Sequence, residues 1–377
     1  MDAEEWQRTG LYDPTAPGAD ERKALLEYLT ERGATIDQMV DAHRLGGLPA
    51  VAGDIVAGPV IPPVSVAEVA AGLGVTAERV ERILLAVGLP VVADDVLPHD
   101  LPALLRTFEQ GAAVMGEDAI FAFTRVLGAA AATIAEAAVA LFYAEVGPGS
   151  AREGPDELAR ARVSERAMLA FTAVPESLAG VVMAQFFRTS RRAARVRGWT
   201  VPAAAGSSEI VALGFVDLVG STAWAQELSL RDHSLALSRF ESAAWSSAFL
   251  AGGRVVKMIG DEVFFTAPTV DTACRIGTEI CRAVADDALL PPARGAVGHG
   301  PVLPREGDYF GPLVNVVSRL AKAAPPGLLV VTEDAAASLR PAGWALEALG
   351  PQVLRGLDHA VTAYAVHGDA PPPVAAF

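Results

Sequence analysis

The sequence is poor in cysteine. Only two of its 377 residues are cysteine, Cys274 and Cys281, and they lie seven positions apart in a predicted helix. That spacing is two helical turns, which is farther than a disulfide can reach, so we expect two reduced thiols. Chains without disulfides are typical of reducing compartments, and the sequence therefore favours a cytoplasmic protein.

Positive charge is also scarce. The chain has 30 Lys and Arg against 45 Asp and Glu, a net charge of −15. A surface this acidic repels the phosphates of DNA and RNA, so we expect no nucleic-acid partner. A small nucleotide that arrives with divalent cations is not repelled in this way, because the metal screens its phosphates.

The chain has no clear leader or membrane span. Its first ten residues, MDAEEWQRTG, are acidic and lack an apolar core, which argues against a signal peptide. The most apolar stretch, residues 119–146, contains Arg125 and Glu136. Charges inside such a stretch argue against a transmembrane segment, so we predict a buried helix and no transmembrane segment.

Composition changes along the chain and predicts two domains. Residues 1–20 contain prolines and a glycine and are predicted to be a flexible tail. Helical patterns fill residues 21–187, with one helix predicted from about 157 to 197, and residues 188–206 are predicted to be a connecting helix end and linker. Alternating strand and helix patterns occupy residues 207–367, and residues 368–377 are a second tail. The fold class is therefore predicted as α+β, with an all-helical N-terminal domain.

Two segments of the C-terminal half place a carboxylate at the end of a strand. FVDLVGST (215–222) puts Asp217 after a buried apolar run and before a turn into a helix, where backbone N–H groups can hold phosphate oxygens. VVKMIGDEVFF (255–265) puts Asp261 in the tight turn of a hairpin. Two carboxylates of this kind can hold hard divalent cations through oxygen.

A third segment supplies an amide and a guanidinium. GDYFGPLVNVVSRL (307–320) places Asn315 and Arg319 four residues apart in a predicted helix, so both lie on one face. Groups of this kind suit the negative charge that develops on a phosphoryl group during transfer.

These three segments, in this order and spacing, resemble the catalytic core of class III nucleotidyl cyclases. The resemblance implies a ferredoxin-like catalytic domain over residues 207–367 and active sites at the interface of a head-to-tail homodimer. It also implies roles for seven residues: metal binding by Asp217 and Asp261, adenine recognition by Lys257 and Asp308, transition-state stabilisation by Asn315 and Arg319, and a triphosphate contact by Arg355.

By the same resemblance, the chain is an adenylyl cyclase that converts ATP into 3′,5′-cyclic AMP and pyrophosphate with two divalent cations, Mg²⁺ or Mn²⁺. The base-reading pair agrees with ATP. Adenine offers an amino donor and a ring-nitrogen acceptor, which a carboxylate and an ammonium satisfy, whereas guanine presents the reverse polarity at its O6 edge.

The N-terminal half resembles the regulatory domain that precedes the catalytic domain of some actinobacterial soluble, pH-regulated adenylyl cyclases. The resemblance rests on pieces such as ERKALLEYLTERG and VERILLAVGL. It implies autoinhibition, release that depends on pH through histidines near the connecting helix, and a small-molecule or lipid ligand. This chain departs from the pattern because it has no histidine between His99 and His233, so a connector histidine is not its pH sensor.

Two alternatives remain open from the sequence. Residues 64–89 read as helix, turn, helix and could bind DNA, although Glu78 and Glu81 accompany Arg79 and Arg82 on the second helix. The C-terminal half could also be a cyclase fold that has lost catalysis and serves as a signalling scaffold.

Overall fold

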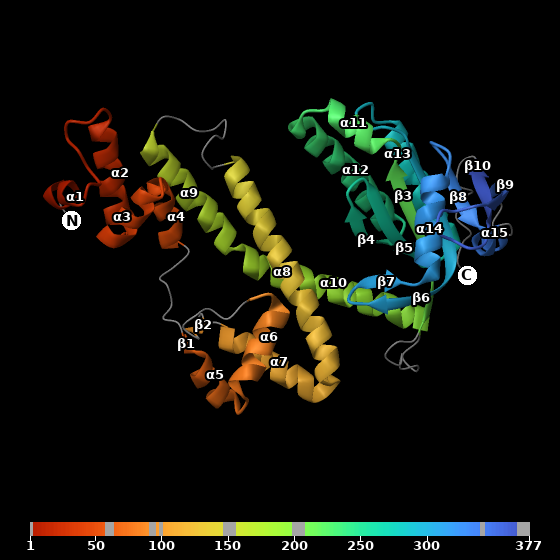
Figure 1. Cartoon of the computed structure of the whole chain (residues 1–377), viewed down its shortest axis with the longest axis horizontal. Helices are drawn as coiled ribbons and strands as arrows, with labels where there is room; N and C mark the ends of the chain where they lie inside the picture. Colours follow the sequence, from red (N-terminus) through yellow and green to blue (C-terminus); the bar gives the residue numbers. More distant parts are fainter. Residues whose placement is uncertain are drawn as a thin grey trace. The chain divides into compact units, whose positions relative to one another are not determined.

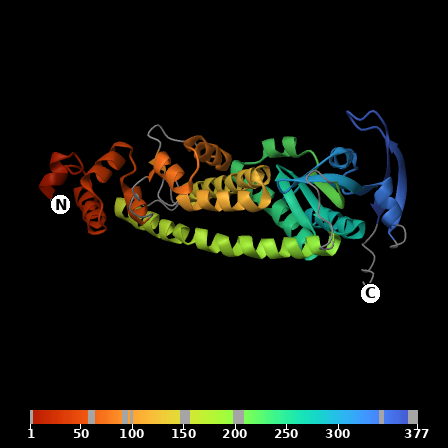
Figure 2. The ribbon, with the colours of Figure 1, turned by 90° about the horizontal axis from the view of Figure 1, so that it is seen from below.

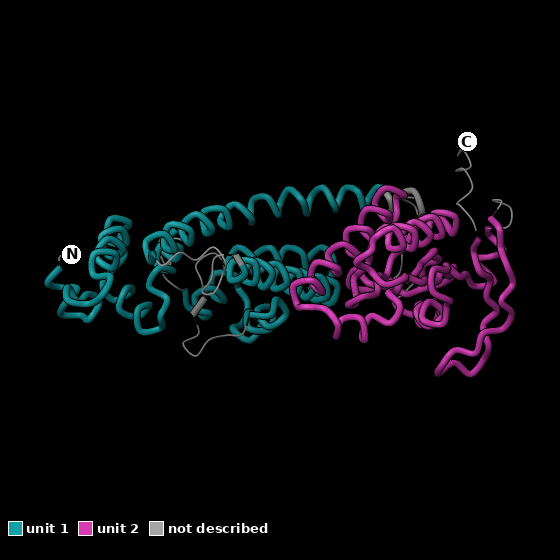
Figure 3. The backbone as a smooth tube through the Cα atoms, turned by 90° about the horizontal axis from the view of Figure 1, so that it is seen from above, with its two compact units in different colours: residues 1–192 teal, residues 193–377 magenta. Residues whose placement is uncertain are grey.

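The computed structural model describes residues 3–56, 64–89, 96–97, 101–145, 156–197, 208–339 and 344–367. The chain divides into two compact units, Met1–Arg192 and Ala193–Phe377 (Figure 3). The described part of the first unit is helical apart from one two-stranded ribbon, and the second combines a large sheet with helices. The predicted α+β class with a helical N-terminal half is therefore confirmed.

The elements of the first unit are labelled in Figure 1. They are α1 (Ala3–Arg8), α2 (Ala19–Glu31), α3 (Ile36–Arg44), η1 (Leu48–Ala50), α4 (Val51–Val56), β1 (Val64–Ser65), α5 (Val66–Leu73), α6 (Ala77–Val87), β2 (Val96–Leu97), α7 (Leu101–Met115), α8 (Glu117–Glu145), α9 (Glu157–Thr172) and α10 (Val174–Arg197).

The start of the chain is not a flexible tail, and that prediction is wrong for the described residues. Trp6 of α1 is 3% exposed and Leu11 is 2% exposed, and both pack in one core with the apolar face of α2. The prolines and the glycine that suggested a tail form the turn between α1 and α2. Two large apolar side chains are enough to hold this short segment, because each buried side chain contributes roughly 2 kcal/mol.

Helix α8 forms where a helix was predicted, but most of it is not buried. Its first part packs on α6 and α7. The approach to α6 is close at Gly128, because the Cβ of an alanine there would lie 2.1 Å from the Val87 carbonyl oxygen. Beyond that contact its large side chains are exposed: Val139, Leu141 and Tyr143. The prediction of a buried helix failed because sequence hydropathy does not show whether a partner surface is present within the same chain.

The segment predicted as one helix from 157 to 197 is two helices that follow one another in a gently curved run (Figure 2). They divide at Ala173, two residues before Pro175, which lacks the N–H that a continuous helix would need. Over Glu117–Ala144 and Glu157–Arg191, the helices are long and apolar enough to cross a membrane. That test uses length and composition alone, so the absence of a transmembrane segment stays a prediction.

The second unit is built on a mixed sheet. Its elements are β3 (Glu209–Leu218), α11 (Ser221–Glu227), α12 (Leu230–Leu250), β4 (Arg254–Ile259), β5 (Glu262–Ala267), α13 (Val270–Ala285), β6 (Ala293–Arg305), β7 (Asp308–Phe310), α14 (Pro312–Ala323), β8 (Leu329–Thr332), α15 (Glu333–Leu339), β9 (Ala345–Gln352) and β10 (Val361–His367). The strand order is β4-β5-β3-β6-β8-β10-β9, and β7 pairs with the end of β6. Only the β6–β8 pair is parallel among these described strands.

Both faces of the sheet are covered. Along β3, Ala212 and Val216 pack in the core beneath α12 and α13, whereas Leu213 and Phe215 pack in the core beneath α14. This alternation follows from the two-residue period of a strand, and it places Asp217 on the α14 face.

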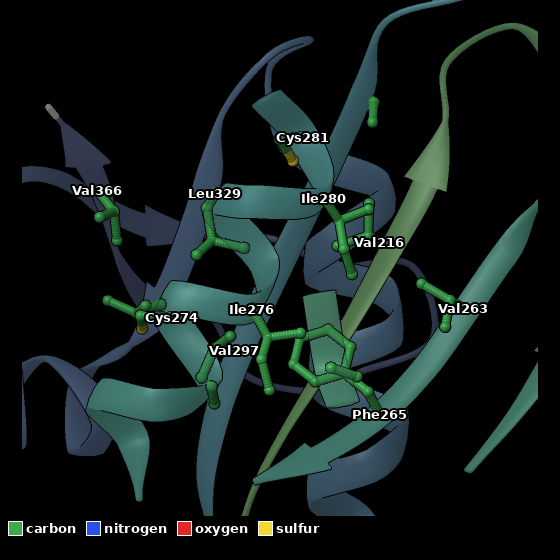
Figure 4. Close-up of a cluster of buried hydrophobic side chains, with 14 of the residues drawn as sticks. Val216, Val263, Phe265, Cys274, Ile276, Ile280, Cys281, Val297, Leu329 and Val366 are labelled. Atoms are coloured by element: carbon green, nitrogen blue, oxygen red, sulfur yellow. The ribbon is translucent and has the colours of Figure 1, made fainter. Parts of the chain in front are cut away.

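The two cysteines lie in the α12–α13 core, and Figure 4 shows both on α13 among apolar side chains. Both thiols are free and buried, which confirms the prediction of reduced thiols. Burial raises the pKa of Cys281 to about 12 and that of Cys274 as well. Neither thiol is a nucleophile at neutral pH, so both serve as core residues.

Candidate active site

Asp217 lies at the end of the central strand β3 and is 7% exposed. Arg294, its cross-strand partner on β6, donates hydrogen bonds to Asp217 Oδ2 from Nε at 3.2 Å and from Nη2 at 3.1 Å. Burial raises the pKa of the Asp217 carboxyl, the bonds from Arg294 oppose this, and the nearby charge of Asp261 adds to it, for a net rise. The site thus concentrates negative charge where little water reaches it.

Asp261 is fixed beside Asp217 by the main chain. It follows Gly260, whose φ of 64° lies in the left-handed region that the tight β4–β5 turn requires. The Leu218 N–H, one residue after Asp217, donates to the Asp261 carbonyl oxygen at 3.1 Å. This bond joins the end of β3 to the turn, so the two carboxylates share one end of the sheet.

This donor set fits divalent cations that arrive with a nucleotide. Among the described residues, no group of three or more His, Cys, Asp or Glu side chains is placed to hold a metal ion. Mg²⁺ needs no such group, because it is usually held by one or two carboxylates together with substrate phosphates and water. Asp217 and Asp261 supply two carboxylates of this kind.

Lys257 and Asp308 are in direct contact. Lys257 Nζ lies 2.5 Å from Asp308 Oδ2, and Asp308 Oδ1 accepts a hydrogen bond from the Tyr309 N–H at 2.8 Å. The register of β4 shifts at Val256, so Lys257 lies opposite Phe264 rather than Val263. Without this bulge Lys257 would point to the α12–α13 core. The bulge instead places its ammonium on the α14 face, with Asp217.

Helix α14 carries Asn315, which is exposed, and Arg319 one turn later. Arg319 Nη1 donates to the Gly356 carbonyl oxygen at 2.8 Å. That bond ties α14 to the loop in which Arg355 is exposed. Among the described residues, no hydrogen bond or ion pair joins Asp217 or Asp261 to Asn315 or Arg319. The predicted residues therefore form separate groups within one chain.

Relatives identify the family. No protein-family model matches the chain. It is 33% identical over 372 residues to an uncharacterized protein of Mycobacterium tuberculosis, covering 97% of this chain and 94% of that protein. It is 28% identical over 358 residues to a pH-sensitive adenylate cyclase of the same organism, covering 89% and 85%. It is 39% identical over 129 residues to an adenylate cyclase of Glutamicibacter nicotianae, covering 34% and 32%.

The chain belongs to the class III nucleotide cyclase family. Among solved structures, the adenylyl cyclase CyaB from P. aeruginosa is similar, with 20% identity, a TM-score of 0.38 and coverage of 43% of this chain and 96% of that one. The guanylyl cyclase Cya2 is also similar, with 18% identity, a TM-score of 0.40 and coverage of 45% and 97%.

Sequence reasoning missed four residues around the aspartates of this cyclase: Arg294, Glu262, Ser318 and Lys322. Arg294 neutralises Asp217, and Ser318 and Lys322 of α14 contact Glu262, the residue after Asp261. The signal for Arg294 and Glu262 is cross-strand register, because both lie directly opposite Asp217 on neighbouring strands. That register could be assigned only after the strands had been paired.

The arginines that could bind DNA phosphates in the helix-turn-helix alternative form ion pairs within the chain. The predicted helix-turn-helix is present as α5 and α6, with Gly74 and a Thr76 N-cap in the turn. Arg79 lies 2.7 Å from Glu109 and 3.1 Å from Glu117, and Arg82 lies 3.5 Å from Glu117. Both arginines of α6 thus bind carboxylates of α7 and α8, which disfavours phosphate binding by this helix.

Proposed function

We propose that this cyclase converts ATP into 3′,5′-cyclic AMP and pyrophosphate at sites shared by two copies of the chain. The observation that carries this proposal is the placement of Asp217 and Asp261 at one end of the sheet, joined by the Leu218 N–H to Asp261 carbonyl bond. Two carboxylates held this closely suit phosphoryl chemistry on a nucleotide.

Asp217 and Asp261 are the residues that would hold two divalent cations, Mg²⁺ or Mn²⁺. When bound, such cations lower the pKa of the ribose 3′-hydroxyl and neutralise the charge of the triphosphate. Asp217 keeps one oxygen bonded to Arg294, so this arginine fixes the orientation of the carboxylate that faces the nucleotide.

Asn315 and Arg319 complete the site from a second copy in a head-to-tail homodimer. Their positions on α14 allow them to stabilise the charge on the α-phosphate as the 3′-oxygen attacks in line and pyrophosphate leaves. Arg355 lies next to Gly356, which accepts the bond from Arg319, so its loop is placed to contact the leaving phosphates. We assign no residue as a dedicated base; the proton of the 3′-hydroxyl would pass to solvent water.

Lys257 and Asp308 read the adenine. Within one chain they pair with each other, with Lys257 Nζ 2.5 Å from Asp308 Oδ2. When adenine binds, the Asp308 carboxylate accepts a hydrogen bond from its amino group, and the Lys257 ammonium donates one to a ring nitrogen. These two contacts replace the ion pair between Lys257 and Asp308. Guanine offers an oxygen to the carboxylate and an N–H to the ammonium, and it leaves both unpaired.

Base preference tests this assignment. The double variant Lys257→Glu, Asp308→Cys is expected to lower kcat/KM for ATP by at least about 100-fold, because a buried polar edge then loses both partners. The ratio of GTP to ATP turnover is expected to rise. Initial rates with each nucleotide and Mn²⁺ measure both quantities.

The matched control for this variant is Lys23→Glu, a charge reversal of a similarly exposed lysine on α2. It should leave the ATP rate unchanged. Unaltered ATP turnover in the double variant would show that Lys257 and Asp308 do not read the base.

We further propose that the N-terminal unit controls this activity, and that the protein acts in the cytoplasm. What supports control is the pair of consecutive helices α9 and α10, which directly precede the catalytic unit in the sequence. The α9 end is held to α2 by Arg22–Glu157 at 2.7 Å and Arg32–Glu165 at 2.6 Å. We propose that the switch is the order of residues 185–206; residues 198–206 of this stretch lie outside the described residues.

A further inference from the structure

Glu262 is a buried carboxylate whose two oxygens are both occupied. It is 3% exposed and lies directly opposite Asp217 in the β3–β5 register. Lys322 Nζ lies 3.1 Å from Glu262 Oε2, and Ser318 Oγ donates to Glu262 Oε1 at 3.2 Å. Because Glu262 immediately follows Asp261, these two contacts fix the base of the turn that carries a proposed metal ligand.

The partners of Glu262 come from the same helix as the proposed transition-state residues. Asn315, Ser318, Arg319 and Lys322 all belong to α14 and have the spacing i, i+3, i+4, i+7. Such positions share one side of a helix, within roughly 100° of its circumference. Two residues of this stripe, Ser318 and Lys322, therefore hold the hairpin of their own chain, whereas Arg319 bonds the Gly356 carbonyl oxygen and Asn315 is exposed.

The carboxylate is the buried member of this pair: the Glu262 side chain is 4% exposed, whereas that of Lys322 is 53% exposed. Burial raises the pKa of the Glu262 carboxyl, and the hydrogen bond from Lys322 opposes that rise. Losing the ammonium would leave a carboxylate almost without water and with only one hydroxyl as a partner. Buried charges in that state force a local rearrangement.

We propose that Glu262 and Lys322 form a positioning clamp that ties the Asp261 turn to α14, so that the metal-binding and transition-state residues of one chain keep a fixed relative geometry. The inference rests on the proposed function, because it assigns the clamp to that same site. Glu262 and Lys322 are positioning residues and do not contact the nucleotide. The clamp acts through Asp261 on one site of the dimer and through Arg319 on the other.

Lys322→Met tests the clamp, because methionine keeps the length of the side chain and removes its charge. We expect Mn²⁺ binding by the full chain, followed by electron paramagnetic resonance of the free ion, to weaken by roughly tenfold or more. We expect kcat to fall with little change in KM for ATP, because the base-reading pair is intact. Lys322→Arg, which restores a cation, should recover most of both losses.

A second variant keeps the test informative if Lys322→Met unfolds. Glu262→Gln with Lys322→Met removes both charges and leaves no unpaired buried ion, so it should melt closer to the wild type than Lys322→Met while Mn²⁺ binding stays weak. The matched control is Arg239→Met, which breaks the ion pair of Arg239 with Asp287 at 3.1 Å between α12 and the end of α13. It should change neither Mn²⁺ binding nor kcat.

Wild-type Mn²⁺ affinity and kcat in folded Lys322→Met, or in the double variant, would overturn the clamp. Failure of the proposed function gives a different result. If the wild type binds no more Mn²⁺ than Asp217→Ala does, the metal site is absent, and both the proposed function and the clamp are overturned.

Discussion

Replacing Asp217 or Asp261 with alanine is expected to lower cyclic nucleotide formation by roughly a thousandfold, the effect of losing several kcal/mol of transition-state stabilisation. Asp217 and Asp261 are the two carboxylates that the proposed site supplies to divalent cations. Raising the Mn²⁺ concentration should not restore the rate, because one carboxylate cannot position two cations. Initial rates across a Mn²⁺ series measure the effect.

Folding must be separated from catalysis in these variants. Asp217→Ala leaves Arg294 without its carboxylate partner, so Asp217→Asn, which keeps the shape and one acceptor oxygen, is the better-matched change. The control is Asp286→Ala, which should retain full activity. Asp286 directly follows α13, and its exposed carboxylate pairs with Arg282 of that helix. Activity near the wild-type level in Asp217→Asn or Asp261→Ala would refute catalysis through these carboxylates.

Mixing two inactive variants is expected to restore activity. Asp217→Ala damages the metal half of a site and Arg319→Ala damages the other half. In a mixed dimer both lesions fall in one site, and the second site is intact. With random pairing, half of the dimers are mixed and each has one working site of two, so about one quarter of wild-type activity should return.

The matched control for this experiment is a mixture of Asp217→Ala with Asp261→Ala. Both lesions then lie in the same half, so every site of the mixed dimer is damaged and no activity should return. Differently tagged chains verify that mixed dimers form. If they form and the first mixture stays inactive, each site is built within one chain and the shared-site account is wrong.

Local patterns were enough to predict the main elements of the catalytic unit. The hairpin around Asp261 was predicted by two apolar runs separated by Gly260, and it is present as β4 and β5. Strand β3 and helix α14 also lie where apolar period and spacing placed them. Each of these elements is determined by neighbours within about ten residues, which a sequence pattern records directly.

Features that depend on pairing between distant segments were not predicted. The bulge at Val256 turns Lys257 to the α14 face, yet nothing in VVKMIG distinguishes a bulged strand from a regular one. The contact between Glu262 and Lys322 joins residues sixty positions apart and depends on how α14 packs on the sheet. The sequence pattern did not predict strand β9, whose residues are exposed or partly buried and show little alternation.

Burial was predicted wrongly in two places where it was inferred from the hydropathy of the sequence alone. Helix α8 is largely apolar, but α6 and α7 cover only its first part, so Leu141 and Tyr143 remain exposed. Trp6 shows the opposite error. Its segment is acidic and is followed by prolines, so it was predicted to be a flexible tail, yet Trp6 is buried in the core. In both cases the deciding factor is the surface that the rest of the chain presents, which composition does not record.

Product analysis tests the central claim most directly. The purified full chain is incubated with ATP and Mn²⁺, and the products are separated by chromatography and identified by mass. The account predicts 3′,5′-cyclic AMP and pyrophosphate in equal amounts, a much slower reaction with GTP, and no cyclic product from Asp261→Ala. Absence of cyclic AMP from the folded wild-type chain, or cyclic GMP formed faster than cyclic AMP, would contradict it.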